Sequence, residues 1–119
     1  MSMINPKQRE IWWVDLDPTL GSELKKKRPI VVVNNDLYPY PNTRIVVPLR
    51  DWIDRFDDNP LYTKLIPSSV NGLKKECSPD VFHIRAVDIQ RFSTQLGILA
   101  EDEMKNITAS IFMITEFLP

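Results

Sequence analysis

The chain has 119 residues, the length of a single domain, and its 43% hydrophobic and 26% charged residues are typical of a soluble globular protein. A formal net charge of -1 excludes binding of a polyanion through overall charge, so a nucleic-acid site must come from local clusters of cations. One cysteine and one histidine exclude an internal disulfide and argue against a metal site. No apolar run reaches the ~20 residues of a membrane helix. We therefore expect one cytoplasmic domain over residues 1–119, without membrane contact, metal or cofactor.

Two apolar runs predict the first two strands, with a loop of residues 17–27 between them. Glu10–Leu16 is rich in aromatic and β-branched residues, and its alternation places Trp12, Val14 and Leu16 on the core face. The continuous run Ile30–Val33 predicts a strand that is buried on both faces, with a proline just before it.

The middle of the chain predicts shorter elements. Arg44–Leu49 is a third strand, in which Pro48 favours an edge position or a bulge. Asp51 is suited to cap a short helix, and Leu61–Ile66 alternates as a further strand.

The last third predicts two more strands and one long helix. Asp80–Val87 and Leu96–Leu99 are the strands, and apolar residues recur at steps of three and four over Glu101–Phe117. The predicted fold is mainly β: a small, partly open barrel with a short inserted helix and a C-terminal helix.

The loop between the first two strands contains the clearest cluster of cations. After Glu23 come three lysines and an arginine: Lys25, Lys26, Lys27 and Arg28. Such a run is more often a solvated surface than a site, but the buried strand that follows fixes the backbone of Arg28. Arginine suits bidentate phosphate binding, and Glu23 is suited to act as a general base on the same pocket.

Several motifs resemble those of one known family. The run EIWWVDLDPTLGSELKKKRPIVVV, at residues 10–33, resembles the N-terminal signature of the MazF/PemK toxins. IVVPL at 45–49, NGLKK at 71–75, and HIRAVD with RF between 83 and 92 extend the resemblance over nearly the whole chain. It implies an SH3-like barrel working as a homodimer. It also implies the toxin of a type II toxin–antitoxin system, with a cognate antitoxin.

The resemblance further implies a metal-independent endoribonuclease that cleaves single-stranded RNA at short sequences. The 2′-OH attacks the adjacent phosphorus and leaves a cyclic phosphate and a 5′-OH. Carried onto this chain, Arg28 is the essential arginine and Glu23 is the base or orienting acid. The expected RNA contacts are Ser22, Lys25, Lys26, Lys27, Trp13, Lys74, Lys75 and Arg85.

Two positions depart from the family pattern. Many members have Ser or Thr where this chain has Arg50, which we include in the catalytic set as a second cation for the phosphorane. The alternative is a surface arginine paired with Asp51 or Asp54. Many members also have an acid where this chain has Phe82, and here the nearest acid is Asp80.

Three further alternatives stay open at this point. The barrel could belong to a non-catalytic toxin of the CcdB type, which acts on gyrase by binding, or to an inactive relative that only binds antitoxin. His83 is more often structural at such a position, and we leave it outside the catalytic set. Trp13 either stacks on a base or lies on the barrel exterior or dimer interface.

Overall fold

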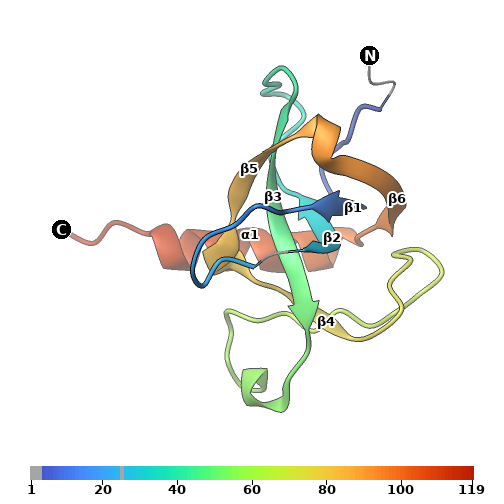
Figure 1. Cartoon of the computed structure of the whole chain (residues 1–119). Coiled ribbons are helices and arrows are strands. Elements are labelled where there is room, and N and C mark those ends of the chain that lie inside the picture. The colour runs from blue at the N-terminus through green and yellow to red at the C-terminus, as the bar shows by residue number, and fades with distance from the viewer. Residues whose placement is uncertain (1–3, 25) are drawn as a thin grey trace.

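The computed structural model describes residues 4–24 and 26–119. Its described strands form one six-stranded sheet, followed by a helix (Figure 1). The elements are β1 (Glu10–Asp15), β2 (Lys27–Val32), β3 (Thr43–Asp51), β4 (Cys77–Pro79), β5 (Arg85–Asp88), β6 (Phe92–Ile98) and α1 (Glu101–Thr115). The predicted mainly β fold with a C-terminal helix is confirmed. No helix in the described part of the chain is long and apolar enough to cross a membrane.

The sheet is antiparallel and open, with the order β4-β3-β2-β1-β6 and with β5 also paired to β3. The prediction of an edge position for Pro48 is wrong, because β3 is a central strand. The carbonyl of Pro48 accepts a hydrogen bond from the backbone N–H of Asp80 at 2.9 Å. Its nitrogen faces the same side, at the point where the partner of β3 changes from β5, along Thr43–Val46, to β4, along Leu49–Asp51. Proline is tolerated there because no ladder hydrogen bond is lost.

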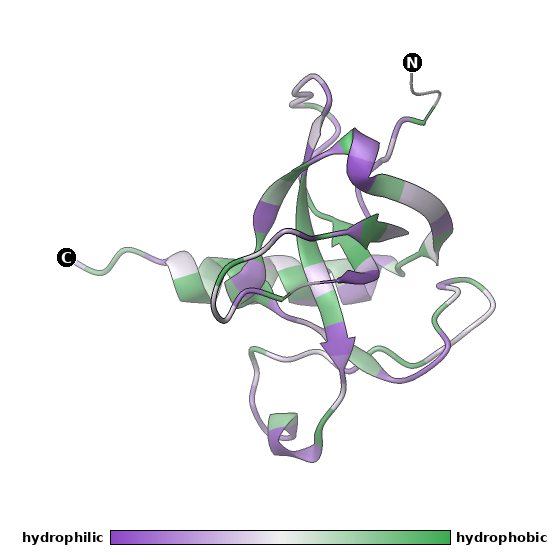
Figure 2. Ribbon diagram, viewed as in Figure 1, coloured by the Kyte–Doolittle hydropathy of each residue, from purple (hydrophilic) through white to green (hydrophobic). Residues whose placement is uncertain are grey.

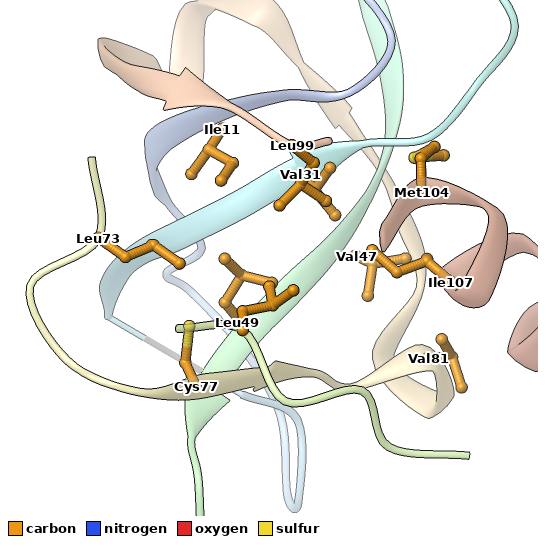
Figure 3. Packing of buried hydrophobic residues seen from close by; sticks show 11 residues of the cluster. Ile11, Val31, Val47, Leu49, Leu73, Cys77, Val81, Leu99, Met104 and Ile107 are labelled. Atoms are coloured by element: carbon orange, nitrogen blue, oxygen red, sulfur yellow. The ribbon is translucent and has the colours of Figure 1, made fainter. Parts of the chain in front are cut away.

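The core consists of two clusters, one on each face of β1. Trp12, Val14 and Leu16 are buried together as predicted. Ile11, on the opposite face, is also fully buried, in a cluster that α1 covers. In Figure 3, Met104 and Ile107 of α1 face Val47 of β3. The strands β1 and β3 are therefore apolar through their middles, whereas the end of β3 at Asp51 is polar (Figure 2).

Three predicted elements are wrong in type or extent. The short inserted helix is a three-residue 3-10 turn, η1 (Asp54–Phe56), and Asp51 ends β3 instead of capping it. Leu61–Ile66 does not form the predicted strand. Its one bridge among the described residues joins Leu65 to Cys77, so the segment pairs with β4 at a single residue and forms no ladder. The helix α1 ends at Thr115.

The region 77–98 also differs from its prediction. Residues predicted to begin a strand at Asp80 form a 3-10 turn, η2 (Val81–His83), because the Asp80 carboxylate accepts a hydrogen bond from the N–H of Phe82. The strand starts only at Arg85. The last strand is longer than predicted, because β6 begins at Phe92 after a second such turn, η3 (Ile89–Arg91).

Candidate functional site

A cavity of about 590 Å³ opens between the ends of β2 and β3 and the segment 72–75. In Figure 1 this segment runs toward β4, past the arrowhead of β3. The cavity has an apolar floor and a cationic rim. The floor includes Pro29, Leu49, Leu73, Cys77 and Leu96, and the rim includes Lys27, Arg28, Arg50, Lys74 and Lys75.

Two arginines on neighbouring strands belong to this rim. Arg28 and Arg50 each lie two residues beyond the Ile30–Pro48 pair on their strands, and both line the cavity. The Nη1 of Arg28 donates to the carbonyl of Leu49 at 3.3 Å. Two guanidinium groups on neighbouring strands are suited to a phosphate group that gains negative charge during a reaction.

Arg50 is held by Asp80, which lies 30 residues away in sequence, and by the nearby Phe56. Its Nη1 is 3.1 Å from Oδ2 of Asp80, a side chain only 3% exposed. Its guanidinium carbon lies 5.6 Å from the centre of the Phe56 ring. The alternative of a surface pair with Asp51 or Asp54 is therefore wrong. Asp51 pairs instead with Lys75, whose Nζ is 3.0 Å from its Oδ1.

One wall of the cavity is fixed by Asn71, which the sequence indicated only as part of the NGLKK motif. This side chain is 4% exposed. Its Nδ2 donates to the carbonyl of Ile66 at 2.9 Å, and its Oδ1 accepts from the N–H groups of Ser68 and Leu73. Gly72 has a φ of +69°, and a Cβ at this position would lie 2.0 Å from the carbonyl oxygen of Leu96. The wall therefore depends on both residues of the Asn-Gly pair.

Comparison with known proteins places the chain in a family. Residues 7–114 match the family described as PemK-like, MazF-like toxin of type II toxin-antitoxin system. The chain belongs to this family. It is 30% identical to the endoribonuclease MazF9 of Mycobacterium tuberculosis over 111 residues, which cover 88% of this chain and 92% of that protein. It is also 30% identical over 105 residues to the endoribonuclease MazF of Staphylococcus epidermidis, covering 82% and 81% of the two chains.

Solved structures agree in fold. MazF from Deinococcus radiodurans superposes with a TM-score of 0.77 at 18% identity, over 94% of this chain and 97% of that one. A mycobacterial endoribonuclease in complex with its cognate antitoxin gives a TM-score of 0.71 at 15% identity, over 97% and 100%. The prediction of a MazF-type toxin with endoribonuclease relatives is confirmed at the level of the family.

The toxin brings together only part of the predicted site. The cavity is lined by Trp13, Lys27, Arg28, Arg50, Lys74 and Lys75. Trp13 is 39% exposed, next to Pro29 across the β1–β2 pair. Lys25 lies outside the described residues. The remaining predicted residues do not line the cavity: Ser22, Glu23, Lys26 and Arg85.

Two of these outlying residues are engaged elsewhere. Glu23 is exposed, and its Oε1 accepts a hydrogen bond of 2.5 Å from the backbone N–H of Leu20. The Nη1 of Arg85 donates to the carbonyl of Leu16 at 3.4 Å. Asp51 is the one carboxylate among the described residues that line the cavity.

His83 makes contacts that its place in the sequence did not reveal. Its Nε2 is 3.1 Å from the carbonyl oxygen of Ser22, and its Nδ1 is 3.1 Å from Oδ2 of Asp80. The imidazole thus lies between the β1–β2 loop and the partner of Arg50. The segments involved are 61 residues apart in the chain, so no local pattern could have indicated the contact.

The remaining groups of the cavity limit its chemistry. Burial raises the pKa of the Cys77 thiol to about 12 from an ordinary 9.0. The thiol therefore stays protonated near neutral pH and lines the cavity without acting as a nucleophile. Within residues 4–24 and 26–119, no group of three His, Cys, Asp or Glu side chains is arranged to hold a metal ion. The cavity is instead suited to bind an anion through arginine and lysine.

Proposed function

We propose that the toxin cleaves single-stranded RNA in this cavity, without a metal ion. The observation that carries the proposal is the convergence of two arginines and three lysines on one concave surface in a chain whose net charge is -1. Local clustering of this kind is what binding of a polyanion requires here, since overall charge gives no attraction. The endoribonuclease relatives favour cleavage over the binding-only and inactive alternatives.

The proposed reaction is attack by the 2′-oxygen of the RNA on the adjacent phosphorus. A base removes the 2′-OH proton, the bond from phosphorus to the 5′-oxygen breaks, and that oxygen takes up a proton. The products are a cyclic phosphate and a 5′-OH. Arg28 and Arg50 would stabilise the added negative charge of the pentavalent phosphorane, and Lys27, Lys74 and Lys75 would bind neighbouring phosphates.

Glu23 stays our proposed base, although its carboxylate does not line the cavity. Among the described residues from 17 to 26, none is buried, so the loop that contains Glu23 has little packing to oppose its movement toward bound RNA. Trp13 is proposed to stack on a base at the cavity edge.

We also propose two protein partners. One is a cognate antitoxin that places an acidic segment against the cationic rim, in keeping with the antitoxin complexes among the structural neighbours. The other is a second copy of the toxin. Large apolar side chains remain exposed near the end of α1, among them Phe112, Phe117 and Leu118, which supports a homodimer.

The test is cleavage of a long RNA in EDTA, with mapping of the 5′-OH ends. We expect cleavage to persist in EDTA, and Arg28→Ala to lower its rate by about 100-fold or more, the effect of losing one transition-state donor. Arg55→Ala, at an exposed arginine outside the cavity, is the matched control and should cleave at the wild-type rate. Equal loss in both variants, or full activity of Arg28→Ala, contradicts the site. Absence of cleavage together with capture of gyrase supports the CcdB-type alternative.

A further inference from the structure

We propose that the buried carboxylate of Asp80 is a positioning group, which fixes Arg50 at the cavity and, through His83, the middle of the β1–β2 loop. The inference rests on the proposed function of the cavity. It concerns how the two parts of the site, on β3 and on the loop, are held relative to each other.

Asp80 is buried in a way that requires partners. The residue is 2% exposed, and a buried carboxylate is strongly destabilising unless it is paired and hydrogen-bonded. Its Oδ2 lies 3.1 Å from Nη1 of Arg50, and its Oδ1 accepts from the N–H of Phe82 at 3.2 Å. Its own backbone N–H is bonded to the carbonyl of Pro48 on β3. The backbone N–H and the Oδ1 of Asp80 therefore each have a hydrogen-bond partner that is independent of Arg50.

Arg50 is confined on two sides. Asp80 holds one nitrogen of the guanidinium, and the Phe56 ring lies against it at 5.6 Å. Phe56 is itself 4% exposed and is stacked on Tyr62, with ring centres 4.0 Å apart. The Arg50 side chain is still 32% exposed and lines the cavity. It is thus held in place while it remains open to a ligand, which is the arrangement that lowers the cost of ordering it during binding.

His83 extends this arrangement to the loop. Its Nε2 lies 3.1 Å from the carbonyl oxygen of Ser22, and its Nδ1 lies 3.1 Å from Oδ2 of Asp80 in a close contact that does not have hydrogen-bond geometry. The base of the loop is held separately, by Arg91, which donates to the carbonyls of Asp15 and Asp17. His83 therefore restrains the middle of the loop, next to Glu23.

A purely structural role for Asp80 can be separated from a positioning role, because the chain offers a matched residue. Asp88 caps η3 as Asp80 caps η2, by accepting from the N–H of Gln90 at 2.8 Å. Asp88 is exposed and does not line the cavity. Asp88→Asn therefore removes a capping carboxylate without touching the site.

The experiment compares Asp80→Asn, His83→Gln and Asp88→Asn in the full chain, by kcat and KM for RNA and by the rate of tryptic cleavage after Lys26, at the end of the loop. We expect Asp80→Asn to lower kcat by about 10-fold or more with KM changed by less than about 3-fold, and to speed loop cleavage by about 5-fold. In an Arg50→Ala background, Asp80→Asn should lower kcat by no more than His83→Gln does, because the Arg50 contact is already lost. Asp88→Asn should match the wild type in every measurement.

Other outcomes are decisive as well. Wild-type kcat and wild-type loop cleavage in Asp80→Asn would overturn the proposal, as would equal effects in Asp80→Asn and Asp88→Asn. If Asp80→Asn does not fold, His83→Gln decides through the same loop cleavage, which should again rise by about 5-fold. If the wild type cleaves no RNA, the proposed function fails, while tryptic cleavage still supports or overturns the role of Asp80.

Discussion

The two segments on either side of the cavity are built in opposite ways. The β1–β2 loop carries four of the eleven predicted catalytic and RNA-binding residues, Ser22, Glu23, Lys25 and Lys26, yet its described residues between 17 and 26 include no buried side chain. The segment 67–76 contains the buried Asn71 and packs Gly72 against Leu96. The β1–β2 loop is therefore held by little packing, whereas segment 67–76 is rigid.

This difference in packing separates the proposed catalytic base, on the loop, from the residues that fix the shape of the cavity. Segment 67–76 is held further by its neighbours, since the N–H of Ile98 donates to the carbonyl of Val70 and Gly97 leaves no room for a Cβ beside that carbonyl. Lys74 and Lys75 therefore start from a fixed backbone. Glu23 starts from a loop that is held by hydrogen bonds, such as that between His83 and the Ser22 carbonyl, and little by packing.

The largest expected effect comes from the two glycines with positive φ, one in each segment. Gly72→Ala should destabilise the protein by more than about 3 kcal/mol, because the new Cβ lies 2.0 Å from a backbone oxygen at a φ of +69°. Gly21→Ala, at a φ of +56° with nothing within 4 Å, should cost only about 1 kcal/mol. Chemical denaturation measures both free energies of unfolding. Equal losses would show that the two segments are restrained alike.

The elements that local pattern determines were the ones that could be predicted. Alternation gave β1 and the periodic apolar stripe gave α1, since each depends on one buried face. The strand β4 was missed because Cys-Ser-Pro has no alternation and is defined by pairing with β3, for example Arg50 with Ser78. Tertiary contact overrides sequence preference in such short strands.

The site divides along the same line. Arg28 could be predicted, because its motif fixes it at the start of a buried strand. The partner of Arg50 could not, because Asp80 lies 30 residues away and meets it only after β3 and β4 pair. The hydrogen bonds of Asn71 likewise depend on the folded path of its loop.

A second prediction concerns alkaline pH and Cys77, which directly follows segment 67–76. Its thiol has a pKa of about 12 in the folded chain against an ordinary 9.0, chiefly because of burial. Below pH 9 the thiol is protonated in both the folded and the unfolded chain, and its contribution to stability is fully present. As the pH rises from 9 toward 12, the thiol of the unfolded chain loses its proton first, so this contribution to stability is lost. We expect the free energy of unfolding to fall by up to about 1.4 kcal/mol per pH unit in this range.

Other groups also titrate there, so the measurement is a difference between wild type and Cys77→Ser across pH 8 to about 11.5. The variant keeps the shape of the side chain without the titrating thiol. A difference that does not change with pH would mean that the thiol is reached by solvent, and that segment 67–76 opens as readily as the β1–β2 loop.

The smallest effect should come from single lysines in the two segments. Lys74 lies on the rigid segment 67–76 and lines the cavity, whereas Lys26 lies on the exposed β1–β2 loop and outside the cavity. With a pool of 2′-O-methyl RNA, which lacks the attacking hydroxyl, Lys74→Ala should weaken binding by about 2- to 5-fold and reduce the log–log salt slope by about 0.7, the loss of one phosphate contact. Lys26→Ala should change affinity by less than about 2-fold. Fluorescence anisotropy at several salt concentrations measures both. If Lys26→Ala has the larger effect, RNA is bound mainly by the β1–β2 loop, and segment 67–76 shapes the cavity without contributing to affinity.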